Sequence, residues 1–132
     1  MKKYLFEYDP GLADRYDIFS RGIAASIGRE ASPEVMDILF HEEEVGAMDH
    51  SSQGLDRYTL LSSDLIFTME AKQTDYVLKL EPTAQARVFP LSKFLPGSPE
   101  KDIQDPIGQA KVIYQKVYEE IKQSVVELRE WL

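Results

Sequence analysis

The clearest pattern in the chain is an amphipathic repeat near its C-terminal end. Between residues 109 and 131, apolar positions recur in alternating steps of four and three, with charged and amide side chains between them. The apolar positions are Tyr114, Tyr118, Ile121, Val125, Leu128 and Leu132. This spacing predicts one long helix with a single buried face. A coiled-coil seam has a similar spacing, but three heptads are short for one, so a helix lying on a sheet is favoured.

Shorter apolar runs earlier in the chain predict strands. Residues 65–69 are almost continuously apolar, which is typical of a strand covered on both faces, as in a parallel sheet. Residues 87–91 form a second such run, which its own proline, Pro90, brings to an end. Residues 16–20 are rich in aromatic and branched side chains and precede Gly22, so we expect a third strand that ends in a glycine turn.

Helices are predicted between these strands. Ser32 and Pro33 form a strong helix start, with serine as the N-cap and proline at the first helical position. That helix runs into the acidic residues 42–44, which suit a helix C-terminus poorly because the helix dipole disfavours negative charge there. Residues 55–62 and 72–80 are predicted as two further helices.

The alternation of strands and helices predicts a three-layer α/β fold, with a mostly parallel sheet flanked by helices. We find no linker, so residues 1–132 are expected to form a single domain. Ligands bind at the carboxyl ends of the strands in such folds. The site is therefore expected just after Ser20, Met69 and Leu91.

The composition of the chain argues against several classes of partner and site. The 132 residues carry a net charge of −8, with a pI near 4.7, which argues against nucleic acid and anionic lipid as partners. No stretch approaches the run of about 18 apolar residues that a membrane span needs. The N-terminus does not resemble a signal peptide, so we expect a cytoplasmic protein. The chain contains no cysteine, which excludes disulfides, thiolate metal sites and a cysteine nucleophile.

Six segments follow one another in an informative order. They are Ser20-Arg21-Gly22-Ile23-Ala24-Ala25, Ala31-Ser32-Pro33-Glu34, Asp49-His50-Ser51-Ser52-Gln53-Gly54-Leu55, Ser63-Asp64-Leu65-Ile66-Phe67-Thr68-Met69, Val88-Phe89-Pro90-Leu91-Ser92-Lys93-Phe94 and Asp102-Ile103-Gln104-Asp105-Pro106. In this order they resemble the low-molecular-weight protein-tyrosine phosphatase family. The likeness is greatest to its bacterial branch, which includes protein-arginine phosphatases. No single segment is specific, but together they cover almost the whole chain.

The resemblance implies a phosphotyrosine phosphatase I-like fold and a function in protein dephosphorylation, with no cofactor and with phosphoproteins as partners. In the family, a cysteine in a Cys-x5-Arg loop attacks phosphorus as a thiolate, and the arginine holds the phosphoryl oxygens. An aspartate in an Asp-Pro loop protonates the leaving oxygen. The matching residue here is Asp105, which without the resemblance would be interpreted as the cap of a turn before Pro106. The resemblance also implies that His50 and Ser20 support the site structurally.

The chain departs from the family pattern at its N-terminal end. Residues 1–9 most resemble the end of the family's first helix, as if the first strand and the phosphate loop had been removed. In a second alignment, residues 1–6 resemble the opening strand, and the first helix is lost instead. Neither alignment supplies a cysteine, so the resemblance predicts a protein that is inactive as this chain. A gene start placed too late would have the same appearance.

An unfamiliar nucleophile is the alternative. Asp9 and Arg15 form an Asp-x5-Arg spacing, and aspartate can accept a phosphoryl group. The intervening residues include Pro10 and Asp14, which suit a phosphate-binding nest poorly, so a plain turn at residues 9–11 is favoured.

For several polar residues we favour an interpretation without a role in catalysis or metal binding. His50 beside Ser51 or Ser52 lacks the context of a nucleophile elbow. His41, Glu42 and Glu44 do not have the spacing of a metal site on one helical face, so we expect a solvated acidic face and no metal. Arg21 replaces a small residue of the family turn, and the sequence leaves open whether it serves the site or points to water.

The resemblance also bears on assembly. The family's first strand lies between the second and third strands, so its removal would leave two strand edges unpaired. We therefore expect a homodimer, a strand exchange or a rearranged sheet. A regulatory domain that self-associates in this way competes with the inactive phosphatase and with the active Asp9-Arg15 enzyme.

Overall fold

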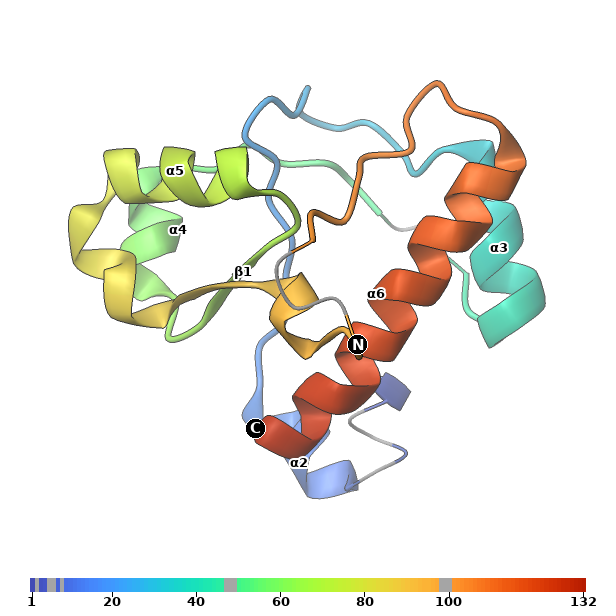
Figure 1. The fold of residues 1–132 in the computed structure, drawn as a ribbon, viewed down its shortest axis with the longest axis horizontal. Helices are drawn as coiled ribbons and strands as arrows, with labels where there is room; N and C mark the ends of the chain where they lie inside the picture. Colours follow the sequence, from blue (N-terminus) through green and yellow to red (C-terminus); the bar gives the residue numbers. More distant parts are fainter. Residues whose placement is uncertain (2, 5–6, 8, 47–49, 98–100) are drawn as a thin grey trace.

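Two short parallel strands lie at the centre of the molecule (Figure 1). The structure is a computed structural model that describes residues 1, 3–4, 7, 9–46, 50–97 and 101–132, without the side chains of residues 12 and 13. Strand β1 (Ile66–Thr68) pairs in parallel with β2 (Val88–Pro90), in the register Ile66 with Val88, Phe67 with Phe89 and Thr68 with Pro90. Both lie within the predicted apolar runs, and each is three residues long.

The two faces of this strand pair are covered by different helices. On one face, Ile66 and Val88 pack with Leu60 of α4 (Arg57–Ser62) and Val77 of α5 (Ala71–Leu80). On the other face, Phe67 and Met69 pack with a second cluster, which includes residues of α6 (Lys111–Trp131). The predicted three-layer α/β arrangement is therefore confirmed, with the sheet reduced to two strands among the described residues.

The helices follow the sequence patterns closely. Helix α6 buries the predicted stripe, with Leu128 fully enclosed. Helix α3 (Pro33–Glu43) begins as expected, because the Ser32 hydroxyl accepts a hydrogen bond from the Val35 amide at 3.4 Å. Two 3-10 helices, η1 (Pro82–Arg87) and η2 (Leu91–Phe94), flank β2. None of the helices that the structure describes is long and apolar enough to cross a membrane.

The predicted strand at residues 16–20 is wrong. This stretch is irregular, and the pairing that follows it, within the described ranges, is an isolated parallel bridge between Gly22 and Gly54. The Gly22 amide donates to the Gln53 carbonyl at 2.9 Å, and the Leu55 amide donates to the Gly22 carbonyl at 3.0 Å. A strand needs a neighbour to satisfy its backbone groups, and no described strand lies beside residues 16–20. Two smaller corrections are that Leu91 begins η2 instead of ending a strand, and that residues 9–11 start a short helix, α2 (Pro10–Arg15).

The first residues of the chain resemble a helix more than a strand. Residues 3, 4 and 7 are helical, as the first of the two alignments predicts, and Met1 packs against the α6 side of the core. Residues 2, 5, 6 and 8 of these alignments, and Asp49 of the His50 segment, lie outside the described residues.

The end of α3 holds a buried acid. The Glu43 side chain is only 7% exposed and accepts hydrogen bonds from the Tyr4 and Tyr118 hydroxyls and from Lys3 Nζ, the last at 2.8 Å. Lys122 Nζ lies 3.2 Å from the same carboxylate. This Glu43 cluster joins the N-terminal residues, α3 and α6.

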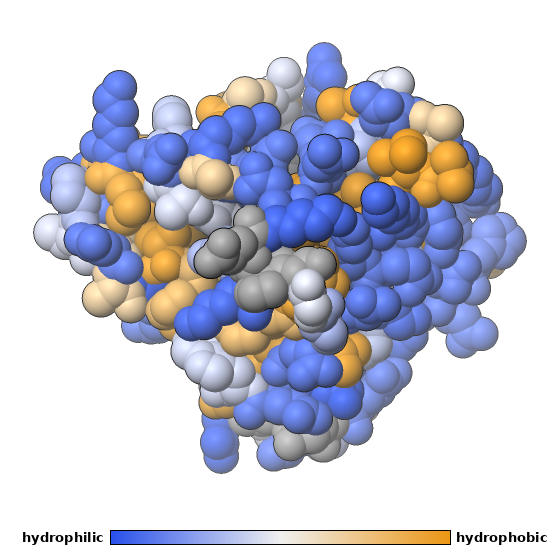
Figure 2. Space-filling model, in the orientation of Figure 1, coloured by the Kyte–Doolittle hydropathy of each residue, from blue (hydrophilic) through white to orange (hydrophobic). Residues whose placement is uncertain are grey.

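Polar side chains cover most of the face drawn in Figure 2, with smaller apolar patches beside α4 and α5 and near the start of α6.

Candidate functional site

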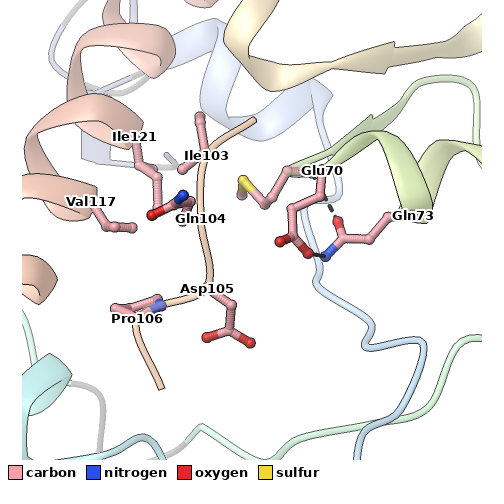
Figure 3. Close-up of a pocket in the computed structure, with 9 residues that line it drawn as sticks. Glu70, Gln73, Ile103, Gln104, Asp105, Pro106, Val117 and Ile121 are labelled. Carbon is pink, nitrogen blue, oxygen red and sulfur yellow. Dashed lines mark hydrogen bonds between the residues drawn. The ribbon is translucent and has the colours of Figure 1, made fainter. Parts of the chain in front are cut away.

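A pocket of about 200 Å³ opens where β1 ends (Figure 3). It lies at the carboxyl end of a parallel strand, where α/β folds bind ligands and where the sequence predicted a site after Met69. Its walls come from the start of α5, from the segment 103–106 and from the middle of α6. The lining residues are Met69, Glu70, Gln73, Ile103, Gln104, Asp105, Pro106, Val117 and Ile121.

Three contacts fix the segment 102–106 over the end of β1. The Asp102 carboxylate accepts a hydrogen bond from the Ala71 amide, at 2.8 Å, and so caps the first turn of α5. The Ile103 amide donates to the Met69 carbonyl at 2.9 Å, and the Ile103 side chain, 2% exposed, is anchored in the core. These contacts make the position of the next two residues a consequence of the fold.

Asp105 is exposed at the rim of the pocket. One of its carboxylate oxygens accepts a hydrogen bond from the Ile107 amide at 3.0 Å, which is the turn-capping role that its neighbour Pro106 suggests. In Figure 3 the carboxylate points away from the Ile103 and Ile121 side chains.

The pocket is acidic. Among the residues that the structure describes, Glu70 and Asp105 are the charged side chains that line it, and no lysine, arginine or histidine does. Lys72 Nζ pairs with Glu70 at 2.9 Å, and this hydrogen bond, with the nearby Asp105 and Asp102 charges, raises the pKa of Lys72 above its ordinary value. A phosphoryl group in this pocket would meet carboxylates and lack the bidentate cation that phosphate recognition uses.

The Gln73 side chain forms hydrogen bonds with two other residues that line the pocket. Its side-chain oxygen accepts a hydrogen bond from the Met69 amide at 2.9 Å, and its side-chain nitrogen donates to Glu70 at 3.5 Å. The order of strands and helices predicts a site after Met69, but it does not distinguish Glu70, Gln73 or Gln104 as lining residues. The signal was available, because polar side chains that directly follow a buried parallel strand are expected to line its ligand pocket.

The other predicted site residues lie elsewhere. None of Ser20, His50, Asp9 and Arg15 lines the Asp105 pocket. Asp9 caps α2 by accepting a hydrogen bond from the Gly11 amide at 2.9 Å, and Arg15 is the last residue of the same helix. Six helical residues separate their backbones by about 9 Å. Ser20 and His50 are both exposed.

Arg21 belongs to a second groove, of about 680 Å³. Its guanidinium lies 4.8 Å from the centre of the Phe19 ring and donates to the Ser20 carbonyl at 2.8 Å. Ser51 also lines this groove, with Asp56 and the exposed Tyr58. The structure thus assigns Arg21 to this groove and not to the pocket that holds Asp105.

The predicted acidic face lies at the end of α3. His41 Nε2 lies 3.2 Å from Asp37, and His41, Glu42 and Glu44 are all exposed. Among the residues that the structure describes, no group of three or more His, Cys, Asp or Glu side chains could hold a metal ion.

Solved structures with the same architecture define the class of protein. A mutant YwlE arginine phosphatase with a phosphorylated active-site serine superposes with a TM-score of 0.84 at 26% identity, over 99% of this chain and 82% of that one. A low molecular weight protein tyrosine phosphatase from T. tengcongensis superposes with a TM-score of 0.85 at 24% identity, over 99% of this chain and 88% of that one. The fold is therefore that of the bacterial low-molecular-weight phosphatases.

Sequence comparison identifies the family. The family model described as low molecular weight phosphotyrosine protein phosphatase matches residues 2–132, so the chain belongs to this family. A probable low molecular weight protein-tyrosine-phosphatase, AmsI of Erwinia amylovora, is 29% identical over 101 residues, which are 76% of this chain and 67% of that protein. The resemblance drawn from the six segments is confirmed.

Proposed function

We propose that this 132-residue chain is a non-catalytic member of the phosphatase family. The observation that carries the proposal is chemical: the chain contains no cysteine to form the thiolate on which the family's reaction depends. The Asp105 pocket strengthens it, because the charged side chains that line it, within the described part of the chain, are the carboxylates of Glu70 and Asp105. A general acid speeds the departure of a leaving group but does not replace the nucleophile that attacks phosphorus.

The Asp9-Arg15 alternative receives little support from the geometry. A phosphate nest needs several backbone N–H groups that converge on one point. Residues 10–15 are instead an α-helix, and the Asp9 carboxylate is already used by the Gly11 amide. In this arrangement Asp9 stabilises the start of α2, and Arg15 lies at its other end.

A weak role in binding phosphoproteins is a further part of the proposal. Glu70 and Asp105 make it unfavourable for phosphate to bind in the pocket, so any such binding would use the exposed Arg21 cation. It would be weak, because Asp17 and Asp56 line the same groove. A cytoplasmic location is proposed because the chain contains no cysteine, whereas disulfides are common in secreted proteins.

The test is a turnover assay with para-nitrophenyl phosphate on the purified chain, run beside AmsI as a positive control. We expect no turnover above buffer for the wild-type chain and for Asp9→Ala, Arg15→Ala and Asp105→Asn. Turnover that Asp9→Ala or Arg15→Ala abolishes would establish the aspartate nucleophile and refute the proposal. Turnover that only Asp105→Asn reduces would refute it too, by showing that Asp105 acts as an acid beside another nucleophile.

A further inference from the structure

Three aromatic side chains form one surface where β2, η2 and α6 meet. Phe89 lies on β2, Phe94 is the last residue of η2, and Trp131 is the last residue of α6. The centre of the Trp131 ring lies 5.6 Å from that of Phe89 and 5.5 Å from that of Phe94. Trp131 is 48% exposed, so this aromatic surface is open to solvent.

The core of the protein fixes the position of these rings. Phe67 of β1 packs against two of them, with its ring centre 6.4 Å from that of Phe89 and 6.0 Å from that of Phe94. Leu91, the first residue of η2, is 4% exposed and shares a core cluster with the fully buried Leu128 of α6. The aromatic surface is therefore built on packed elements and not on a loop.

A cation of the chain itself occupies this surface. Lys93 Nζ lies 4.6 Å from the centre of the Phe89 ring, and 5.9 Å from the centres of the Phe94 and Trp131 rings. All three distances are within the range of about 6 Å over which a ring face attracts a cation. The ion pairs formed among the described residues do not include Lys93, although the chain has 23 aspartates and glutamates. The three rings thus hold a positive charge without the help of a carboxylate.

Lysine is not the cation that such a surface binds best. Lys93 is exposed, and a lysine ammonium is compact and strongly hydrated, so it must give up water to approach the rings. A quaternary ammonium has no N–H group and loses less hydration, and aromatic side chains are the groups that recognise such ions in proteins. The net charge of −8 also draws cations toward the protein.

We propose that Phe89, Phe94 and Trp131 form a binding site for a trimethylammonium group, as in choline or trimethylated lysine, and that Lys93 covers this site until the ligand displaces it. The rings contact one another and form an open surface instead of a closed cage, so we expect a dissociation constant in the millimolar range. This binding needs no phosphoryl chemistry and is independent of the proposed function.

The first experiment is a titration of the chain with choline chloride, followed by the fluorescence of Trp131, the one tryptophan. Sodium chloride at equal ionic strength corrects for salt. The matched control ligand is the uncharged carbon analogue of choline, in which a tert-butyl group replaces the trimethylammonium group. We expect it to bind about two- to five-fold more weakly, the factor that corresponds to a cation–π contact at an exposed site. Equal binding of the two ligands, or no saturable change beyond that of sodium chloride, would overturn the proposal.

The covering role of Lys93 is tested by removing its side chain. Lys93→Ala should bind choline about two- to five-fold more tightly, because the competing cation is gone. Lys116→Ala is the matched control, since it removes the same charge from an exposed position of α6 about 22 Å along the helix from Trp131. Equal affinities of the two variants would refute the covering role.

Two further measurements complete the test. Phe89→Leu keeps the fluorescent reporter and removes the ring nearest to the Lys93 ammonium, so it should weaken choline binding in a chain that urea unfolding shows to be folded. Unchanged affinity of that folded variant would refute the site. Comparison of choline with acetylated and amidated trimethyl-lysine then identifies the source of the ligand. Tighter binding of choline assigns the site to a small molecule, and tighter binding of trimethyl-lysine assigns it to a modified protein.

Discussion

Replacing Glu43 by glutamine should lower the free energy of unfolding without changing the fold. The Glu43 carboxylate is 7% exposed, and its two phenol donors, Tyr4 and Tyr118, approach from different parts of the chain. The ammonium groups of Lys3 and Lys122 contact the same carboxylate, but their side chains are 37% and 33% exposed and stay hydrated when the charge is removed. The phenol hydrogen bonds therefore dominate the expected effect.

The magnitude follows from the change in acceptor. Hydrogen bonds to a charged group contribute about 1.5–3 kcal/mol, and those between neutral groups about 0.5–1.5 kcal/mol. Changing the acceptor of two phenols from a carboxylate to an amide should therefore cost about 2 kcal/mol. Glu43→Ala leaves both hydroxyls without a partner, and we expect about 3–5 kcal/mol, as for other broken buried ionic clusters.

The loss of stability caused by Glu43→Gln should also depend on pH. Burial would raise the pKa of Glu43, but the hydrogen bonds from Lys3, Tyr118, Tyr4 and Lys122 outweigh it and hold the pKa far below its ordinary value of 4.5. A depressed pKa contributes stability that is fully present above pH 4.5 and is lost as the pH falls toward the folded-state pKa. The difference between wild type and Glu43→Gln should therefore shrink below pH 4.5, by about 1.4 kcal/mol per pH unit.

Urea unfolding measures both the loss of stability and its dependence on pH. The chain has one tryptophan, Trp131, whose ring lies 5.6 Å from Phe89 and 5.5 Å from Phe94, so its fluorescence reports the packing of α6 on the strands. With an m-value of about 2 kcal/mol/M, Glu43→Gln should lower the midpoint by about 1 M at pH 7. Glu42→Gln, at an exposed neighbouring position, is the matched control and should change the stability by less than about 0.5 kcal/mol. Equal effects of the two variants, or a difference between wild type and Glu43→Gln that does not shrink at pH 3.5, would refute the reasoning.

Two further predictions concern the glycine bridge and the oligomeric state. A Cβ atom at Gly22 would lie 2.8 Å from the Ala25 Cβ, whereas one at Gly54 would have nothing within 4 Å. Gly22→Ala should therefore cost about 1–3 kcal/mol in the same unfolding assay, and a similar cost for Gly54→Ala would show that the close contact is not the cause. The homodimer expected from the sequence stays a prediction, and sedimentation velocity over a hundred-fold range of concentration checks it: a sedimentation coefficient that stays at the monomer value would count against it.

Much of the fold was predictable because its signals are local. The apolar stripe of α6, the Ser32 cap of α3 and the apolar run of β1 each depend on residues within a few positions of one another. The failed strand at residues 16–20 had an equally good local pattern. A strand exists only when a neighbour satisfies its backbone groups, and that condition is set by the rest of the molecule.

The candidate site was likewise predictable from the sequence only in part. The sequence by itself determined the family, the absence of a cysteine nucleophile and the position of Asp105 in an Asp-Pro loop. Only the tertiary structure decided that Asp102 and Ile103 hold this loop against α5 and β1, and that the pocket beside it is acidic.

The same holds for Glu43, which the sequence presented as one of three acids at an unfavourable helix end. Its burial depends on groups that lie 40 residues before it and 75 residues after it. The energy of a buried charge is set by its neighbours in space, and a local pattern carries no information about those neighbours.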